Sequence, residues 1–160
     1  MNVQLLLGFL LTLLPVFELR GGLPVIVEYT VRNNLPIWPY FLIVIILNIL
    51  LIFLIFLFFD FLHKLFMRIK FYRKVVGKVL DRVQKKVDKV QKRMDRWGYL
   101  ALMFLVAIPL PGTGAWTGTL VAWVMGLDRL KSFIAIALGV IIAGFLVLFL
   151  SLGFFLGFLY

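Results

Sequence analysis

The chain has 160 residues, 64% of them hydrophobic, with a mean hydropathy of +1.10, whereas soluble domains are roughly 45 to 50% apolar, so the composition excludes a soluble protein and predicts an integral membrane protein. The formal net charge is +10, and all of it lies between Lys64 and Arg96, where thirteen Lys and Arg residues accompany three Asp residues. The chain has no cysteine, which excludes disulfides and cysteine-ligated metal sites, and no P-loop, which excludes a self-contained ATP-driven pump.

The first predicted element is a helical hairpin over about residues 3–31. Its apolar first arm, Val3 to Phe17, is too short to cross a hydrocarbon core of about 30 Å. It is followed by Glu18-Leu19-Arg20-Gly21-Gly22-Leu23-Pro24, where glycine and proline favour a break and a return as a second short helix. We therefore expect a re-entrant hairpin, whose non-helical backbone must be buried in protein or line a wet cavity.

Glu18 and Arg20 are the main candidate site residues of this hairpin. A charge at membrane depth costs roughly 2.5 to 3.5 kcal/mol, so such residues are functional candidates by default. We expect Gly21, Gly22 and Pro24 to unwind the backbone, so that both charges face one cavity. Glu18 would then be a proton-responsive acid and Arg20 a contact for an anion such as phosphate. The alternative is a loop at the membrane interface, where both charges are simply hydrated.

The next elements are a transmembrane helix over about residues 36–62 and a basic amphipathic helix over residues 64–98. Asp60 and Lys64 are spaced to pair at the end of the span, and valines recur at helical spacing through the basic segment. The positive charge predicts a cytoplasmic location on an anionic inner leaflet, with a partner-binding or self-associating helix as the alternative. The expected lipid contacts are Lys78, Arg82, Lys85, Lys86, Lys89, Lys92 and Arg93.

The second half is predicted to repeat this order, with a hairpin over about residues 99–127 and a span over about residues 130–160. The break in this hairpin carries no charge, and its candidate site residues are Pro109, Pro111, Gly112, Thr113, Gly114 and Trp116. The amide groups that open the following helix favour an anion. The alternative is that these small residues serve only for close helix packing.

Together these elements predict an all-α integral membrane protein, one membrane domain of residues 1–160. Residues 1–62 form the first repeat and residues 99–160 the second. Each repeat crosses the membrane once, so the second hairpin enters from the opposite face and the repeats are inverted. Broken segments at matching positions of inverted repeats indicate a transporter site near the midplane. We expect a multi-pass protein of the cell membrane, with both chain termini on the outer side.

Two stretches, Pro15 to Pro24 and Pro109 to Trp116, resemble the small multidrug export protein family of archaea and bacteria, over most of the chain. That family is similar to the DedA/VTT superfamily of membrane proteins with paired re-entrant hairpins, several of which are implicated in flipping or scrambling lipids such as polyprenyl phosphates. The resemblance implies that Glu18 and Arg20 match the acidic and basic positions of the first hairpin motif.

The preferred hypothesis is a transporter that flips or scrambles a polyprenyl phosphate, a phospholipid or another lipidic or small amphiphilic substrate, with proton coupling through Glu18 as an open option. One alternative is a small multidrug exporter of amphiphilic cations. The other is a non-transporting scaffold that acts through the basic helix. We expect no enzyme activity, cofactor, metal or nucleic-acid partner; the expected partners are membrane lipids and a second copy of the chain, in a homodimer.

Overall fold

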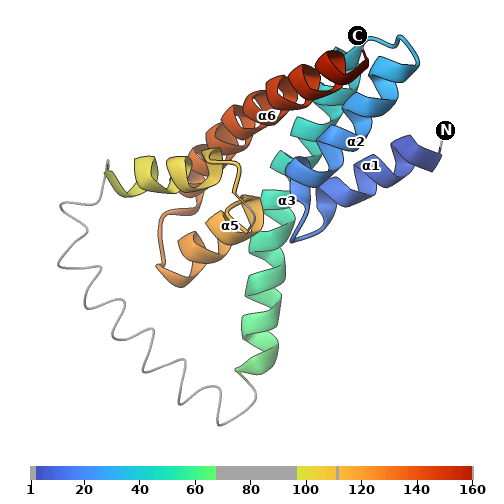
Figure 1. The fold of residues 1–160 in the computed structure, drawn as a ribbon. Coiled ribbons are helices and arrows are strands. Elements are labelled where there is room, and N and C mark those ends of the chain that lie inside the picture. The colour runs from blue at the N-terminus through green and yellow to red at the C-terminus, as the bar shows by residue number, and fades with distance from the viewer. Residues whose placement is uncertain (1–2, 68–96, 111, 160) are drawn as a thin grey trace.

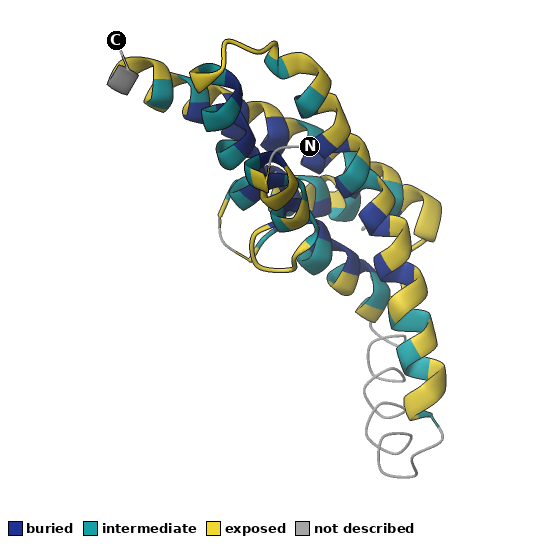
Figure 2. Cartoon of the chain, turned by 90° about the vertical axis from the view of Figure 1, so that its right-hand side faces the viewer, coloured by how far each residue is buried: buried dark blue, intermediate teal, exposed yellow. Residues whose placement is uncertain are grey.

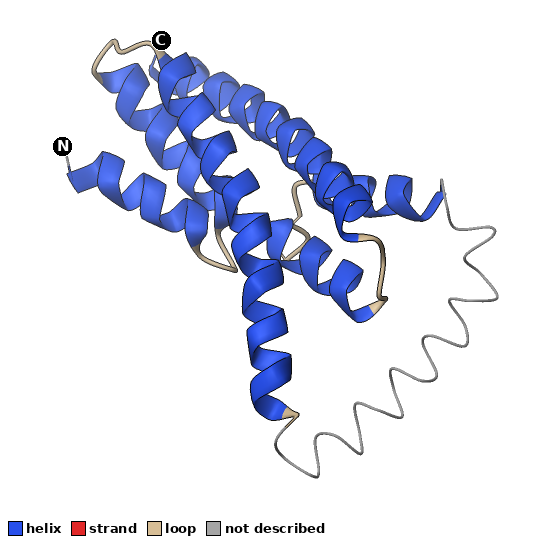
Figure 3. Cartoon of the chain, turned by 180° about the vertical axis from the view of Figure 1, so that it is seen from behind, coloured by secondary structure: helices blue, strands red, loops and turns tan. Residues whose placement is uncertain are grey.

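The computed structural model describes residues 3–67, 97–110 and 112–159. The described part of the chain is helical throughout, with short connections and no strand (Figure 1, Figure 3). The helices are α1 (Val3–Leu13), α2 (Glu18–Arg32), α3 (Ile37–Phe66), the helix Trp97–Ala107, α5 (Ala115–Val124) and α6 (Arg129–Leu159). The seven basic residues expected to touch the inner leaflet, between Lys78 and Arg93, lie outside the described residues.

The two long helices are the two predicted spans. α3 has 30 residues and α6 has 31, and both are long and apolar enough to cross a membrane. They run antiparallel, because the Phe41 and Phe145 rings are 5.0 Å apart towards one end, whereas Asp60 pairs with Arg129 towards the other. Small residues allow the close contact, since a Cβ on Gly144 would lie 2.5 Å from an Ile45 side-chain carbon.

The first hairpin consists of α1 and α2, joined by a turn at residues 14–17. The predicted break at Gly21, Gly22 and Pro24 is wrong, because all three lie inside the continuous helix α2. Gly22 instead permits close packing: a Cβ there would clash with Thr12 and with the Gly8 carbonyl oxygen of α1. The bend lies one turn earlier, and Glu18 follows it with a positive φ of 48°.

The second hairpin consists of the helix Trp97–Ala107 and α5, joined by residues 108–114. Its two ends meet, because the Asp128 backbone N–H donates to the Tyr99 hydroxyl at 3.2 Å. The hairpin packs against α6 through glycine: a Cβ on Gly139 would lie 2.7 Å from Val106. Both ends of this hairpin therefore lie beside the start of α6.

Exposed residues recur along the helices (Figure 2), and many of them are large and apolar. On α3, the exposed apolar side chains include Leu42, Ile43, Ile46, Leu50, Phe53, Leu54 and Leu57. Soluble monomers rarely expose continuous apolar surfaces of this extent. The outer surface of the bundle is therefore suited to lipid, in agreement with the two long apolar helices.

Candidate functional site: the joint between the hairpin turns

Glu18 links the first hairpin to the second. Glu18 is only 4% exposed. Its carboxylate accepts hydrogen bonds from the backbone N–H groups of Ala115 (3.1 Å) and Trp116 (3.0 Å). These two groups open α5, where backbone donors have no partner within the helix. A negative charge is also favoured there by the helix dipole. Glu18 therefore caps a helix that lies almost 100 positions later in the chain.

Arg20 holds the other side of the same break. Its guanidinium donates to the carbonyl oxygens of Val106 (2.9 Å), Ile108 (3.0 Å) and Thr113 (2.8 Å), and also to that of Leu110. These carbonyls come from the end of the helix Trp97–Ala107 and from the following loop. An apolar environment offers such groups no water, so the arginine fork supplies the hydrogen bonds that the broken helix has lost.

Glu18 and Arg20 thus hold the broken second hairpin together, and these two side chains are called the clamp. The expectation that both charges face one open cavity is wrong for Glu18, because its carboxylate is buried against the first turn of α5. Both side chains instead contact the second break, which the sequence placed in a separate hairpin. Opposite charges reach opposite ends of the gap in the helix, each matching the local backbone dipole.

Gly114 leaves the space that the Glu18 side chain of the clamp occupies. A Cβ at this position would overlap the Glu18 carboxylate, and the three nearest atoms to it all belong to Glu18. The Gly114 backbone has φ −106° and ψ −154°, a conformation that other residues adopt, so space and not backbone freedom requires glycine here. The absence of a side chain lets the carboxylate reach the amide groups of α5.

The other predicted site residues of the second break shape its loop. Thr113 donates its hydroxyl to the carbonyls of Ile108 (2.9 Å) and Leu110 (3.0 Å), and Gly112 has a positive φ of 80°. The Trp116 indole N–H donates to the Leu13 carbonyl at 3.3 Å, which adds a second tie to the first hairpin. Pro111 lies outside the described residues.

A cleft of about 400 Å³ lies beside the clamp, between the hairpins and α6. Arg20, Pro24 and Pro109 line one part of it, and Ser151 and apolar residues of α6 line the rest. Arg20 is the charged residue among this lining, and its Nε atom has no hydrogen-bond partner in the described part of the chain. The cleft therefore combines one cationic edge with apolar walls.

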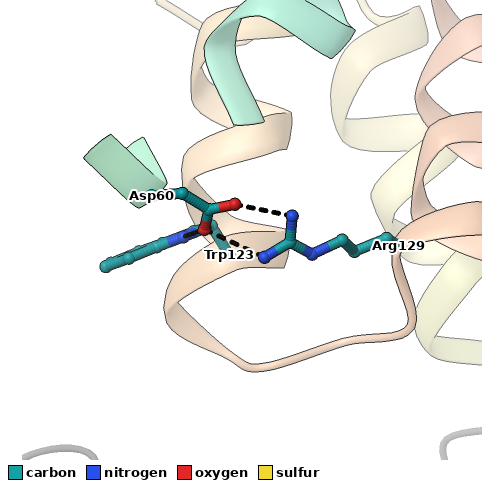
Figure 4. Close-up of polar contacts among 3 residues, drawn as sticks. All are labelled: Asp60, Trp123 and Arg129. Atoms are coloured by element: carbon teal, nitrogen blue, oxygen red, sulfur yellow. Dashed lines mark hydrogen bonds and ion pairs between the residues drawn. The ribbon is translucent and has the colours of Figure 1, made fainter. Parts of the chain in front are cut away.

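A second polar cluster, which no sequence motif indicated, joins α3, α5 and α6 (Figure 4). The Asp60 carboxylate accepts from both terminal nitrogens of Arg129, at 2.6 and 2.9 Å, and from the Trp123 indole N–H at 2.9 Å. The expected pair of Asp60 with Lys64 is replaced by this forked contact to α6. The one sequence feature that could have indicated this contact is that Asp60 and Arg129 are among the few charged residues outside the basic segment.

Within residues 3–67, 97–110 and 112–159, no group of three or more His, Cys, Asp or Glu side chains is placed to hold a metal ion. The clamp itself offers hydrogen bonds and charge. A carboxylate and a guanidinium hold a broken helix together next to a cleft of mixed character.

No curated protein and no solved structure matches the chain. A family model described as "Putative small multi-drug export protein" matches residues 18–146. The matched segment begins at Glu18 and contains the whole clamp, the second hairpin and α3. Because this match covers most of the sequence, the chain belongs to the small multidrug export protein family.

Proposed function

We propose that the protein is a membrane transporter built from two inverted repeats, each with a re-entrant hairpin and one span. Three observations support this arrangement. Each half contains two short helices followed by one long helix. The second hairpin begins and ends beside the start of α6, whereas the first leads directly into the start of α3, which runs the other way. The clamp joins the two hairpin turns.

The proposed transport site is the cleft beside Arg20. On α6 its lining runs from Val147, near the middle of the helix, to Phe155 in the last third, so the cleft reaches from the middle of this span towards its C-terminal end. Arg20 and the Ser151 hydroxyl suit an anionic head group, and the walls from Leu150 and Phe154 suit an apolar chain. The substrate that this combination fits best is an anionic amphiphile such as a polyprenyl phosphate or an anionic phospholipid.

Two features support the proposed similarity to the DedA/VTT superfamily: the paired hairpins, and the charged residues at a hairpin turn. This similarity would make this protein a compact flippase or scramblase. In this proposal the basic segment, with Lys78 to Arg93, lies on the cytoplasmic leaflet. A second copy of the chain would complete the enclosure of a transport path that the helices of one copy line only in part.

Glu18 supplies a route to proton coupling. A carboxylate accepts both backbone N–H groups of α5, whereas a protonated carboxyl group loses much of its strength as an acceptor. Proton uptake would therefore weaken one side of the clamp and allow the second hairpin to move. The arginine side would remain, so the hairpin would pivot on Arg20 and open the adjoining cleft.

Export of amphiphilic cations is the second candidate, and the description of the family favours it. The cleft argues for the anionic substrate instead, because the residues that line it within the described chain include an arginine and no carboxylate. A scaffold that acts through the basic segment would need neither the cleft nor the clamp. Substrate charge and the effect of changes in the clamp therefore separate the three functions.

The test is translocation in proteoliposomes that carry a fluorescent phosphatidylglycerol, a fluorescent phosphatidylcholine or a fluorescent lipophilic cation. We expect the wild type to move the anionic lipid faster than protein-free vesicles do, and Glu18→Gln and Arg20→Lys to lose most of this activity. Arg32→Gln is the matched control, because the exposed Arg32 side chain pairs with Glu28 of its own helix at 2.9 Å and does not line the cleft.

Each other outcome rejects a specific part of the proposal. Movement of the cation but not of the anionic lipid would replace the flippase with the exporter. An anionic lipid that moves equally well in both clamp variants would remove the cleft from the mechanism. If none of the probes moves faster than in protein-free vesicles, transport itself is rejected and the scaffold is favoured.

A further inference from the structure

A second groove, lined by residues other than those of the cleft beside Arg20, carries an ammonium group that forms no ion pair within the described residues. It lies between the helix Trp97–Ala107 and the start of α6, with a volume of about 310 Å³. Leu100, Met103, Ile134 and Leu138 form its apolar length, and Tyr99 and Lys131 form its polar end. We propose that this groove is a binding site for an anionic phospholipid, independent of the transport site.

Lys131 is the cation of this groove, and the Asp128 carboxylate accepts the Lys131 backbone N–H at 2.9 Å instead of pairing with its ammonium group. Its Nζ atom lies 5.8 Å from the centre of the Tyr99 ring, and within the described ranges no carboxylate lies within ion-pair distance of it. Lys131 belongs to the first turn of α6, where the helix dipole disfavours a cation. An anion next to Lys131 removes this unfavourable interaction, and a lipid phosphate is the anion that a membrane supplies.

The neighbouring cation shows the contrast. Arg129 is in the same first turn, but its guanidinium is bonded to both oxygens of Asp60. One of the two cations therefore has an ion pair within the described residues, and the other lies at the polar end of an apolar groove without one. This pattern is suited to a ligand with a negative head and an apolar tail, and a free phosphate ion would leave the apolar length of the groove unused.

The leaflet follows from the position of the groove. Its polar end lies beside the start of α6, and this is the end of the bundle where α3 carries Asp60 and Lys64 before the basic segment begins. Cytoplasmic flanks carry the excess of Lys and Arg. The bound lipid therefore belongs to the inner leaflet, with its phosphate on Lys131 and one acyl chain along Leu138.

The absence of native cysteine allows a direct test. A bimane fluorophore on Leu138→Cys is placed in the groove. The control fluorophore is on Leu54→Cys, another exposed apolar position (58% exposed, against 46% for Leu138) that lies on α3 and does not line the groove. Each labelled protein is reconstituted in vesicles that contain brominated phosphatidylglycerol or brominated phosphatidylcholine. Bromine quenches the fluorophore on contact, so the quenching curves give the relative affinity of each position for the two lipids.

We expect about a fivefold preference for the anionic lipid at position 138, the effect of roughly one basic residue near an anionic head group. Position 54 should show the weaker general preference that the basic segment imposes. Lys131→Gln should reduce the preference at position 138 to that of position 54, and Lys131→Arg should keep it. Lys131 is exposed, so neither change is expected to prevent folding, and unchanged quenching at position 54 confirms insertion.

Three outcomes would overturn the proposal. Equal preferences at the two positions, or a preference that survives Lys131→Gln, would mean that the groove has no lipid site of its own. A preference abolished by inorganic phosphate, but not by chloride at the same ionic strength, would assign Lys131 to a free anion. None of these results depends on transport, so the lipid-site proposal can be rejected while the transport proposal holds. The transport proposal can likewise be rejected while the lipid site is confirmed.

Discussion

The contact between Gly114 and Glu18 allows us to predict how changes in the clamp alter the free energy of unfolding. Glu18→Ala leaves the N–H groups of Ala115 and Trp116 without their acceptor. A buried donor left in this way costs about 1–3 kcal/mol, so for two donors we expect a loss of roughly 2–6 kcal/mol. Gly114→Ala should cost a similar amount, because the new methyl group occupies the space of the carboxylate and forces it away from both donors.

The combination of the two changes is the decisive case. Once the Glu18 carboxylate is absent, the Gly114→Ala methyl group has no carboxylate to displace, and the extended backbone at this position suits alanine. The second change should then cost less than about 0.5 kcal/mol, so the cycle should give a coupling energy of at least about 1.5 kcal/mol. Unfolding in mixed detergent micelles, followed by circular dichroism, measures all three variants.

The control is Gly153→Ala in α6, where a Cβ would meet nothing within 4 Å. This change should be neutral or should stabilise by up to about 1 kcal/mol, because alanine is the better helix former. If Gly114→Ala costs the same in the presence and absence of Glu18, within about 0.5 kcal/mol, the two residues do not share a contact and the clamp is wrongly described.

Three further changes test other contacts by unfolding in detergent. Arg20→Lys should lose about 1–3 kcal/mol, because a lysine has three donors and no planar fork for four carbonyls; wild-type stability would contradict this. Gly22→Ala should lose about 1–3 kcal/mol through overpacking against the α1 backbone, whereas Gly157→Ala, with open space around it, should not; equal effects would reject the close contact. Asp60→Asn should lower the free energy of unfolding by about 1 kcal/mol and should make that free energy much less dependent on salt. Glu28→Gln is the control and should have a smaller effect on both. An unchanged salt dependence in Asp60→Asn would count against the ion pair.

The sequence was sufficient for the helical class and the two long apolar helices, because both follow from the length and composition of apolar runs. It was insufficient for the position of the first bend. Gly21, Gly22 and Pro24 have low helix propensity, yet they lie inside α2. The contact with α1 explains Gly22, since packing that needs a small residue outweighs a propensity cost of about 1 kcal/mol.

The site could be found from sequence only in part. Glu18 and Arg20 were identified by the cost of charge in an apolar segment, a local property. Their partners lie 86 to 98 positions away along the chain, and no periodicity or spacing reports contacts of that range. The same limit explains why Asp60 was expected to pair within its own helix, when the bundle brings Arg129 of α6 to it.

The most direct test of the account is the membrane topology of the two hairpin turns. The single substitutions Val16→Cys, Asn33→Cys, Trp97→Cys and Leu110→Cys are each treated with an impermeant thiol reagent in vesicles of each orientation. We predict that the thiol at position 33 reacts only from outside and the thiol at position 97 only from inside. The thiol at position 16 should never be reached from inside, nor the thiol at position 110 from outside. Reaction at position 16 from the inner face, or at position 110 from the outer face, would mean that the hairpins cross the membrane completely and would contradict two opposed hairpins that meet within it.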